Sequence, residues 1–396
     1  MPEDSTMDVV YLDNYAATPL HPKVKEAMHH IVDEVFGNPS SDHRFGQAAA
    51  EALDTARRQT ANLLHAEPEE IVFTSGGTES VNHAIKGVAF SQREKGRHII
   101  TTNIEHKSVL NCLRTLRLLD YQITSLDVDE YGLVDPAAVE KAITDQTVLI
   151  TIQLANNEIG TIQPIAEIAK IARRKKVVFH TDAVAAAGII PIDVKALDVD
   201  LLSLAANQFN GPNGVGALYV RRGTPLWPLL EGGVQENRKR AGTENVVGIV
   251  GLGMAAEMAW LESHERLEKF RRLRQKLIDG LKARIPHLKF NGHPTQVLPH
   301  LVSVSVEFIE GEGLMLLLDE EGICVATRSA CASGSLRASH VLIGTGMDFA
   351  LAQGTLLITF GRDNTEADVD RLLEVMPRVV QTLRDMSPIY QKEMRA

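Results

Sequence analysis

Short apolar runs alternate with amphipathic helical stretches from about residue 20 to about residue 255, and this alternation restricts the possible folds more than any other feature. Helical patterns cover residues 22–36 and 48–64, and Pro22 in a first helical turn supports the first of them. The apolar runs predict strands over residues 71–73, 98–102, 148–154, 177–180, 201–204 and 216–220. Strands that alternate with helices indicate an α/β fold whose mostly parallel sheet is covered on both faces.

The pattern changes after residue 255. The expected elements are then a long charged helix over residues 254–285, a strand over 301–308, a helix, a loop that contains Cys331, a strand over 355–360 and a helix over 369–386. This mixture is typical of a smaller α+β domain. We therefore expect a large α/β domain over residues 16–255 and a small domain formed by residues 1–15 and 256–396, which carries the Cys331 loop.

Charge and hydropathy argue against two classes of partner. The net charge of −10 leaves no basic excess to neutralise phosphates, which disfavours general binding of nucleic acid. No apolar run approaches the roughly 18 to 20 residues that span a bilayer. The acidic segment over residues 1–14 does not resemble a secretory signal, so we expect a cytoplasmic protein without a membrane partner.

The chain has 3 cysteines, too few for a disulfide framework. Cys112 and Cys324 lie among apolar neighbours, and we expect them to pack as small hydrophobic side chains. Cys331 lies in the small, polar run TRSACASGS, where a thiol is more accessible to chemistry, although an unused residue fits the same pattern.

Polar residues follow the predicted strands at their carboxyl ends, where ligands bind in open α/β sheets. Gly77 and Thr78 follow a strand in IVFTSGGTES, at a helix start that suits a phosphate group. Asp182 in FHTDAV could pair with a pyridinium nitrogen, or it could cap the next helix. His106 could stack on a planar ring or serve as a loop histidine, and Asn157 could bond a ring substituent or satisfy a turn.

These segments and several others occur in the order and spacing of the cysteine desulfurases, which the chain resembles over nearly its whole length. The matching segments are YLDNYAATPLHP, GNPSSDHRFG, FTSGGTES, EHKSVL, NNEIGTIQP, HTDAV, FNGPNGVGALYVRR, AGTENVVGIVG and RSACASGSL. The resemblance implies the type I fold of transferases that depend on pyridoxal phosphate, and it implies pyridoxal phosphate as the cofactor. It also implies a homodimer with two active sites near the subunit interface.

The resemblance also assigns roles to individual residues. It implies that Cys331 is the mobile-loop cysteine that attacks the substrate sulfur and carries a persulfide. The cofactor-binding positions that it implies are Gly77 and Thr78 for the phosphate, His106 for stacking on the ring, Asp182 for the pyridinium nitrogen, Asn157 for the ring oxygen, and Thr243 for the phosphate of the other subunit.

The chain departs from the family pattern where the cofactor lysine is expected. The family reads roughly S-x-H-K-x-Y-G-P-K-G, whereas this chain reads AANQFNGPNG. Gln208 stands at the lysine position, Asn207 at the histidine position and Ala205 at the position of a serine that helps to hold phosphate. An amide is neither basic nor a useful nucleophile, so Gln208 cannot replace a lysine as covalent anchor or proton carrier.

Further departures affect the substrate. Ala185 replaces a glutamine that is expected after Asp182, and Leu357 stands where the family has an arginine for the substrate carboxylate. Arg328 lies in the cysteine loop where a glycine is usual, and its charge could lower the pKa of Cys331. Together these changes indicate a relaxed demand for both cofactor and amino acid.

The first of three hypotheses is a desulfurase-like protein of iron–sulfur cluster assembly and sulfur trafficking, with impaired or no pyridoxal-phosphate chemistry. In that case Cys331 offers a thiolate that carries sulfur or ligates the iron of a shared cluster, and the partner is a U-type scaffold protein or another sulfur acceptor. The second is an active desulfurase that holds its cofactor without a covalent bond. The third is a remodelled pocket for another small ligand, because Gln208, Asn207, Asn210 and Asn213 make that region rich in amides.

Overall fold

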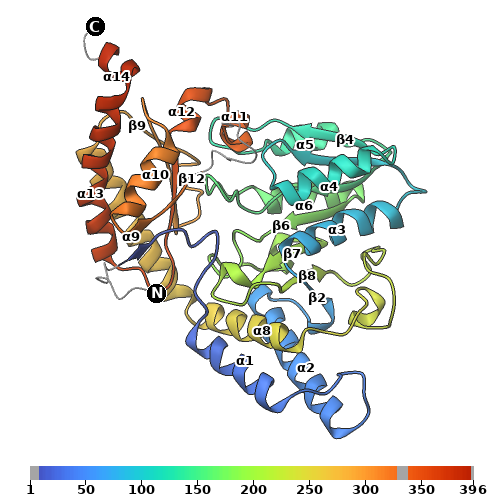
Figure 1. Cartoon of the computed structure of the whole chain (residues 1–396). Coiled ribbons are helices and arrows are strands. Elements are labelled where there is room, and N and C mark those ends of the chain that lie inside the picture. Colours follow the sequence, from blue (N-terminus) through green and yellow to red (C-terminus); the bar gives the residue numbers. More distant parts are fainter. Residues whose placement is uncertain (1–8, 328–337, 394–396) are drawn as a thin grey trace.

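The computed structural model describes residues 9–327 and 338–393. Figure 1 shows two regions, a larger one built on a twisted sheet and a smaller one that contains the C-terminal helices. Cys331 and Arg328 lie outside the described residues. The predicted domain limits at residues 15 and 255 stay a prediction.

A seven-stranded sheet organises the larger region. Its strands, in the spatial order β2-β8-β7-β6-β5-β3-β4, are β2 (Ile71–Thr74), β8 (Gly216–Val220), β7 (Leu201–Ala205), β6 (Val178–Asp182), β5 (Thr147–Thr151), β3 (His98–Thr102) and β4 (Gln122–Leu126). Strand β8 runs antiparallel to both neighbours, and the other pairs are parallel. The predicted α/β fold with a mostly parallel sheet is therefore confirmed.

Helices cover both faces of this sheet because successive strand residues point to opposite sides. In β3, Ile99 packs with α3 (Gly77–Ser91) and α4 (Lys107–Arg117), whereas Ile100 packs into the cluster on the other face. That second face is covered by α5 (Pro136–Ala142), α6 (Ile165–Lys175) and α7 (Val194–Leu197). Burial on both faces explains why the central strands read as apolar runs without alternation.

The predicted helix over residues 254–285 is wrong as a single element. The structure has α8 (Val246–Leu261) and α9 (Ser263–Arg284), which are bent by 71° at the break. Helix α8 is apolar and packs on α1 (Pro22–Glu34) and α2 (Arg44–Leu64), whereas the charged α9 packs on the C-terminal α13 (Glu366–Met386). The two helices thus turn toward different partners, and the carboxylate of Glu262 at the break lies 3.2 Å from Nε2 of His21.

The smaller region contains a four-stranded antiparallel sheet in the order β12-β13-β10-β9. Its elements are β9 (Leu288–Phe290), β10 (Leu301–Val306), α10 (Gly311–Glu320), β12 (Ala326–Thr327), α11 (His340–Gly344), α12 (Phe349–Gln353), β13 (Thr355–Thr359), α13 (Glu366–Met386) and α14 (Pro388–Glu393). The N-terminal β1 (Val10–Tyr11) pairs in parallel with β11 (Ile323–Cys324). Segments from both ends of the chain therefore meet here.

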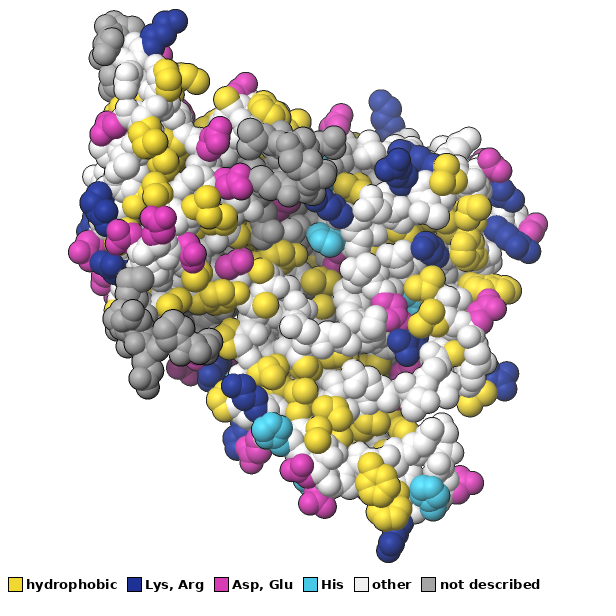
Figure 2. Space-filling model, viewed as in Figure 1, with side chains coloured by type: hydrophobic (Ala, Val, Ile, Leu, Met, Phe, Trp, Pro, Cys, Tyr) yellow, Lys and Arg dark blue, Asp and Glu magenta, His cyan; other side chains and the backbone are white. Residues whose placement is uncertain are grey.

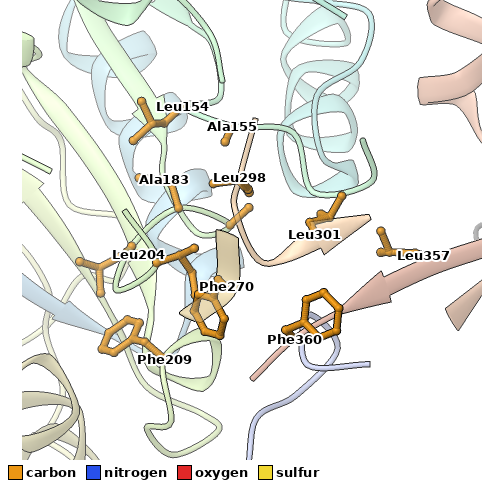
Figure 3. Close-up of a cluster of buried hydrophobic side chains, with 14 of the residues drawn as sticks. Leu154, Ala155, Ala183, Leu204, Phe209, Phe270, Leu298, Leu301, Leu357 and Phe360 are labelled. Carbon is orange, nitrogen blue, oxygen red and sulfur yellow. The ribbon is translucent and has the colours of Figure 1, made fainter. Parts of the chain in front are cut away.

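One apolar cluster joins the two regions (Figure 3). Leu154 and Ala183 follow strands β5 and β6 of the large sheet, Leu301 and Leu357 lie in the small sheet, and Phe360 directly follows β13. Because the cluster is continuous, it fixes the strand ends of the large sheet against the smaller region.

Figure 2 shows basic side chains interspersed with acidic ones on the face that it draws. Within residues 9–327 and 338–393, no single helix is long and apolar enough to cross a membrane, and the bent pair of α8 and α9 meets the length and composition of a span only when taken together.

Candidate functional site

A pocket of about 270 Å³ lies at the carboxyl ends of β5, β6 and β7, beside the N-terminus of α3. Nine of the residues that the sequence singled out line it: Gly77, Thr78, His106, Asn157, Asp182, Ala185, Ala205, Asn207 and Gln208. Strand ends of a parallel sheet converge on one edge, which explains how residues far apart in sequence reach the same cavity.

The start of α3 forms one side of the pocket. Its N-cap, Gly76, has a φ of +142°, a conformation that other residues rarely adopt, and α3 has no side-chain cap. A Cβ atom added to Gly77 would meet Cγ2 of Val184 at 2.7 Å, so the backbone is closely packed there. Uncapped amide groups at a helix N-terminus, with the Thr78 hydroxyl beside them, suit an anionic group such as phosphate.

Asp182 ends β6 and contributes the only carboxylate among the described residues that line the pocket. Its Oδ1 accepts a hydrogen bond of 3.0 Å from the backbone N–H of Val184. Burial disfavours the charged form and raises the pKa of this carboxyl to about 6, although the bond from Val184 lowers it. A cationic ring nitrogen beside Asp182 would restore the charged form of this group.

Glu105 lies behind this carboxylate and is fully buried. It accepts hydrogen bonds from the Thr102 hydroxyl at 2.7 Å and from the backbone N–H of Gln153 at 3.1 Å. Burial raises its pKa to about 8, the two hydrogen bonds lower it, and the charge of Asp182 raises it again. The sequence pattern did not predict a role for Glu105, although this residue directly precedes His106 in the segment NIEHKSV.

His106 lines the pocket and also caps α4. Its Nδ1 accepts a hydrogen bond of 3.1 Å from the backbone N–H of Ser108, so the loop role that the sequence left open is present as well. The ring itself is exposed and can present a face to a ligand. Asn157 is buried and lines the same cavity.

Gln208 lies in the short helix η2 (Ala206–Gln208), directly after β7. Its Nε2 donates a hydrogen bond of 2.9 Å to the backbone oxygen of Tyr15. Asn207, Ala205 and Ala185 line the same part of the pocket. None of the described residues around this cavity is a lysine or an arginine.

Three other predicted positions lie elsewhere or outside the structure. Thr243 lines a separate hollow with Ser75 and Gly242, so its role across a subunit interface stays a prediction. Leu357 is fully buried in β13 and belongs to the apolar cluster of Figure 3. Cys331, as catalytic thiolate or iron ligand, falls outside the described residues and stays a prediction too.

The other two cysteines are free thiols that lie in different surroundings. Cys112 is buried in α4, and burial raises its pKa to about 11. Cys324 is half-buried, and its Sγ lies 3.5 Å from Oδ1 of Asp319. Cys112 therefore packs as predicted, whereas Cys324 has a polar neighbour.

Comparison with known proteins agrees with this architecture. The family model of the class-V aminotransferases matches residues 10–372. The chain belongs to this family. A cysteine desulfurase of Methanosarcina thermophila is 53% identical to this chain over 386 residues, which cover 98% of this chain and 95% of the relative. A cysteine desulfurase of Dictyoglomus turgidum is 48% identical over 383 residues, 97% of each chain.

Solved structures of class-V proteins have the same fold. A NifS-like protein superimposes with a TM-score of 0.89 at 38% identity, covering 95% of this chain and all (100%) of its own. The apo structure of a cysteine desulfurase from Thermococcus onnurineus has a TM-score of 0.84 at 27% identity, with 95% and 96% coverage. The expected type I transferase fold is thus confirmed.

Pyridoxal phosphate is the cofactor of this family, and the pocket fits it only in part. The N-terminus of α3 suits its phosphate, and the buried Asp182 suits its protonated ring nitrogen. When bound, this cofactor withdraws electrons from an attached substrate carbon. The described residues that line the pocket include no lysine amine for a covalent link.

Proposed function

We propose that this class-V chain is a cysteine-desulfurase-like protein of iron–sulfur cluster assembly or sulfur trafficking that lacks pyridoxal-phosphate-dependent desulfuration. The observation that carries this proposal is Gln208, which lies in the pocket at the position where the family pattern has its lysine. The absence of any lysine from the described lining supports the same view, because no neighbouring amine can take over.

The chemistry of an amide explains why the reaction is lost. A lysine amine bonds covalently to the cofactor and moves a proton, and a carboxamide does neither at neutral pH. In addition, Ala205 and Ala185 present only methyl groups to the pocket, and Leu357 is buried among apolar residues. The phosphate of the cofactor therefore lacks the serine of the family pattern. The carboxylate of L-cysteine lacks the arginine of that pattern.

The retained part of the family pattern supports a role in sulfur transfer. Cys331 lies in a segment that keeps the family's small, polar sequence, and a thiolate there can carry sulfur or ligate iron. The partner would be a U-type scaffold protein or another sulfur acceptor, bound by a homodimer of this chain. The relatives named cysteine desulfurase IscS support a role in sulfur chemistry.

The purified protein, mixed with a U-type scaffold protein, iron and sulfide, tests this role. We expect a stable complex and a cluster whose visible absorption disappears in Cys331→Ser. Cys324→Ser is the matched control, because it removes a half-buried thiol of the same chain and should leave the cluster intact. A failure to form any complex, or a cluster that forms equally well in Cys331→Ser, would contradict the proposal.

A second candidate is an active desulfurase with a non-covalently held cofactor. The observation that favours it is that Gly77, Thr78, His106, Asn157 and Asp182 still line one pocket. This candidate predicts a yellow protein that releases sulfide from L-cysteine when pyridoxal phosphate is added. A colourless and inactive preparation under the same conditions would eliminate it.

A further inference from the structure

A second groove lies where the larger and the smaller region meet, apart from the pocket at the strand ends. It has a volume of about 680 Å³ and shares no lining residue with that pocket. Ile162 and Ile190 of the larger region form one side, and α9 and the segment over residues 294–299 form the other. Sites for small ligands have volumes of about 300–1,000 Å³, so this groove is large enough for one.

The floor of this groove is largely apolar. Ile162 and Ile190 pack on the apolar cluster that joins the two regions, but both remain partly exposed. Leu267 of α9 and Val297 are also partly exposed in the groove. Covering such side chains removes apolar surface from water, so the floor favours a ligand with an aliphatic part.

Three arginines of α9 line the groove, but they differ in their charged partners. Nη1 of Arg271 lies 2.7 Å from Oε1 of Glu268, and Nε of Arg272 lies 2.9 Å from Oε1 of Glu366. Arg274 has no carboxylate partner among residues 9–327 and 338–393. It is therefore the one arginine of the three whose charge no described carboxylate offsets.

The contact that Arg274 does make leaves most of its donors open. Its Nε donates a hydrogen bond of 3.1 Å to the backbone oxygen of Leu301. Neither of its terminal nitrogens has a partner in the described part of the chain, and both are accessible to solvent at the groove. Burial of this half-buried side chain lowers the pKa of the guanidinium. The planar guanidinium matches the two oxygens of a carboxylate, which would restore part of the stabilisation that water no longer gives.

We propose that this groove binds an aliphatic monocarboxylic acid, with the carboxylate on the terminal nitrogens of Arg274 and the chain over Ile162, Ile190 and Leu267. An inorganic anion would leave the apolar floor exposed, and a neutral aliphatic molecule would leave the guanidinium unpaired. Glu268 also lines the groove and would repel a second carboxylate, which favours an acid with one charge.

This inference goes beyond the proposed function and does not rest on it. The groove has no residue in common with the pocket that contains Gln208. Loss of ligand binding in the groove would leave the Cys331-dependent cluster unaffected, and loss of the cluster would leave the groove unaffected. The two experiments therefore test separate properties of the chain.

Saturation-transfer NMR of the full-length protein with hexanoate, hexanamide and acetate tests both parts of the site. We expect hexanoate to bind at least about tenfold more tightly than hexanamide, because only the carboxylate forms a charge-assisted pair with a guanidinium. It should also bind at least about tenfold more tightly than acetate, because each buried methylene group contributes about fourfold in affinity. An affinity of hexanoate equal to that of either other ligand, or no binding of hexanoate to the folded protein, would overturn the inference.

Substitutions of Arg274 locate the ligand. Arg274→Gln should lower the affinity for hexanoate at least about tenfold, and Arg274→Lys, which keeps the charge without the planar pair of donors, about threefold. The double variant Arg271→Gln with Glu268→Gln is the matched control, because it removes a paired arginine without a change in net charge. It should change the affinity less than about twofold. An unchanged affinity in folded Arg274→Gln, or an equal loss in the double variant, would place the ligand elsewhere.

A peptide distinguishes a free acid from an acidic side chain of a partner protein. The acetylated amide of leucyl-glutamyl-leucine should bind more weakly than hexanoate, because its backbone amide groups would lose water over an apolar floor. Tighter binding of the peptide would assign the groove to a partner protein and overturn the choice of a free acid. The comparison of ligands uses the unmodified chain and does not depend on the folding of any variant.

Discussion

Two walls of the pocket present different chemistry. The strand-end wall, which comprises Gly77, Thr78, His106, Asn157 and Asp182, offers a helix N-terminus and a carboxylate. The amide wall, which we define as Ala205, Asn207 and Gln208, offers a methyl group and two neutral amides. The comparison teaches that a pocket can keep the groups that recognise a ring and a phosphate while it lacks the group that would bond to them.

The largest effect is expected when the amide wall regains the lysine of the family pattern. With pyridoxal phosphate, followed by reduction with borohydride, Gln208→Lys should retain roughly one pyridoxyl group per chain at residue 208, because the lysine amine forms an imine with the aldehyde and borohydride reduces this imine to a stable secondary amine. Mass spectrometry of the peptides locates the group. Gln208→Arg provides a cation of similar length without a nucleophilic amine and should gain none.

No adduct in a folded Gln208→Lys protein would show that the amide wall does not occupy the position of the family lysine. An adduct of equal yield in Gln208→Arg would show that the linkage forms elsewhere. Either result would break the comparison between the two walls.

The next effect concerns the anchoring of the amide wall. Asn210 follows η2 with a φ of +67°, donates from Nδ2 to the oxygen of Pro19 at 2.9 Å, and accepts from Nη2 of the buried Arg266 at 3.0 Å. Asn210→Ala would leave both partners unsatisfied and should lower the free energy of unfolding by about 2–4 kcal/mol, measured in urea.

Asn210→Asp is the matched comparison for this anchor. Aspartate tolerates the left-handed backbone and still accepts from Arg266, so it loses only the bond to Pro19. We expect less than half the destabilisation of Asn210→Ala. Similar losses in the two variants would mean that the contact with Arg266 contributes nothing measurable.

A smaller effect concerns Glu105, which lies behind the strand-end wall, and the dependence of the free energy of unfolding on pH. The pKa of Glu105 is raised to about 8 in the folded chain, chiefly by burial, from an ordinary value of 4.5. The folded chain therefore holds this proton more tightly, and the contribution of Glu105 to stability is lost as the pH rises from about 4.5 to about 8. The slope is at most about 1.4 kcal/mol per pH unit.

Glu105→Gln removes this titration and keeps a neutral acceptor. The free energy of unfolding of the original chain, minus that of Glu105→Gln, should fall between pH 5 and pH 8 in urea titrations. Glu320→Gln, at the exposed end of α10, is the control, and the free energy of unfolding of the original chain minus that of Glu320→Gln should not change with pH. A flat difference for Glu105→Gln as well would contradict the raised pKa of Glu105.

The smallest effect concerns the hydroxyl beside the start of α3. Thr78→Val keeps the shape of the side chain and removes one donor, so the affinity for inorganic phosphate should fall about threefold to tenfold. Calorimetric titration measures this change. Thr55→Val, on the exposed side of α2, is the control, and an unchanged affinity in Thr78→Val would remove the hydroxyl from the phosphate site.

Much of the fold was predictable because its signals are local. Runs without charged residues, such as residues 98–102 and 216–220, became strands of the same extent, since burial on both faces excludes charged side chains. Strand β4 was missed because its residues are half-exposed at the sheet edge and do not form an apolar run. The break at Glu262 was missed because it depends on which partners α8 and α9 contact.

The site was predictable where strand ends converge. Asp182 and Asn157 could be placed in one pocket because parallel strands end at the same edge of a sheet. The contact between Gln208 and Tyr15 joins residues that are 193 positions apart, and neither residue shows it in a local pattern. The burial of Glu105 was likewise invisible, because a charged residue beside a loop histidine is ordinarily exposed.

Turnover of L-cysteine by the unmodified chain in excess pyridoxal phosphate tests the central claim most directly. Desulfuration would form L-alanine and leave one sulfur atom as a persulfide on Cys331, so the two products should appear in equal amounts. We predict neither alanine by chromatography nor a persulfide by mass spectrometry. Alanine that forms in step with a Cys331 persulfide would contradict the account.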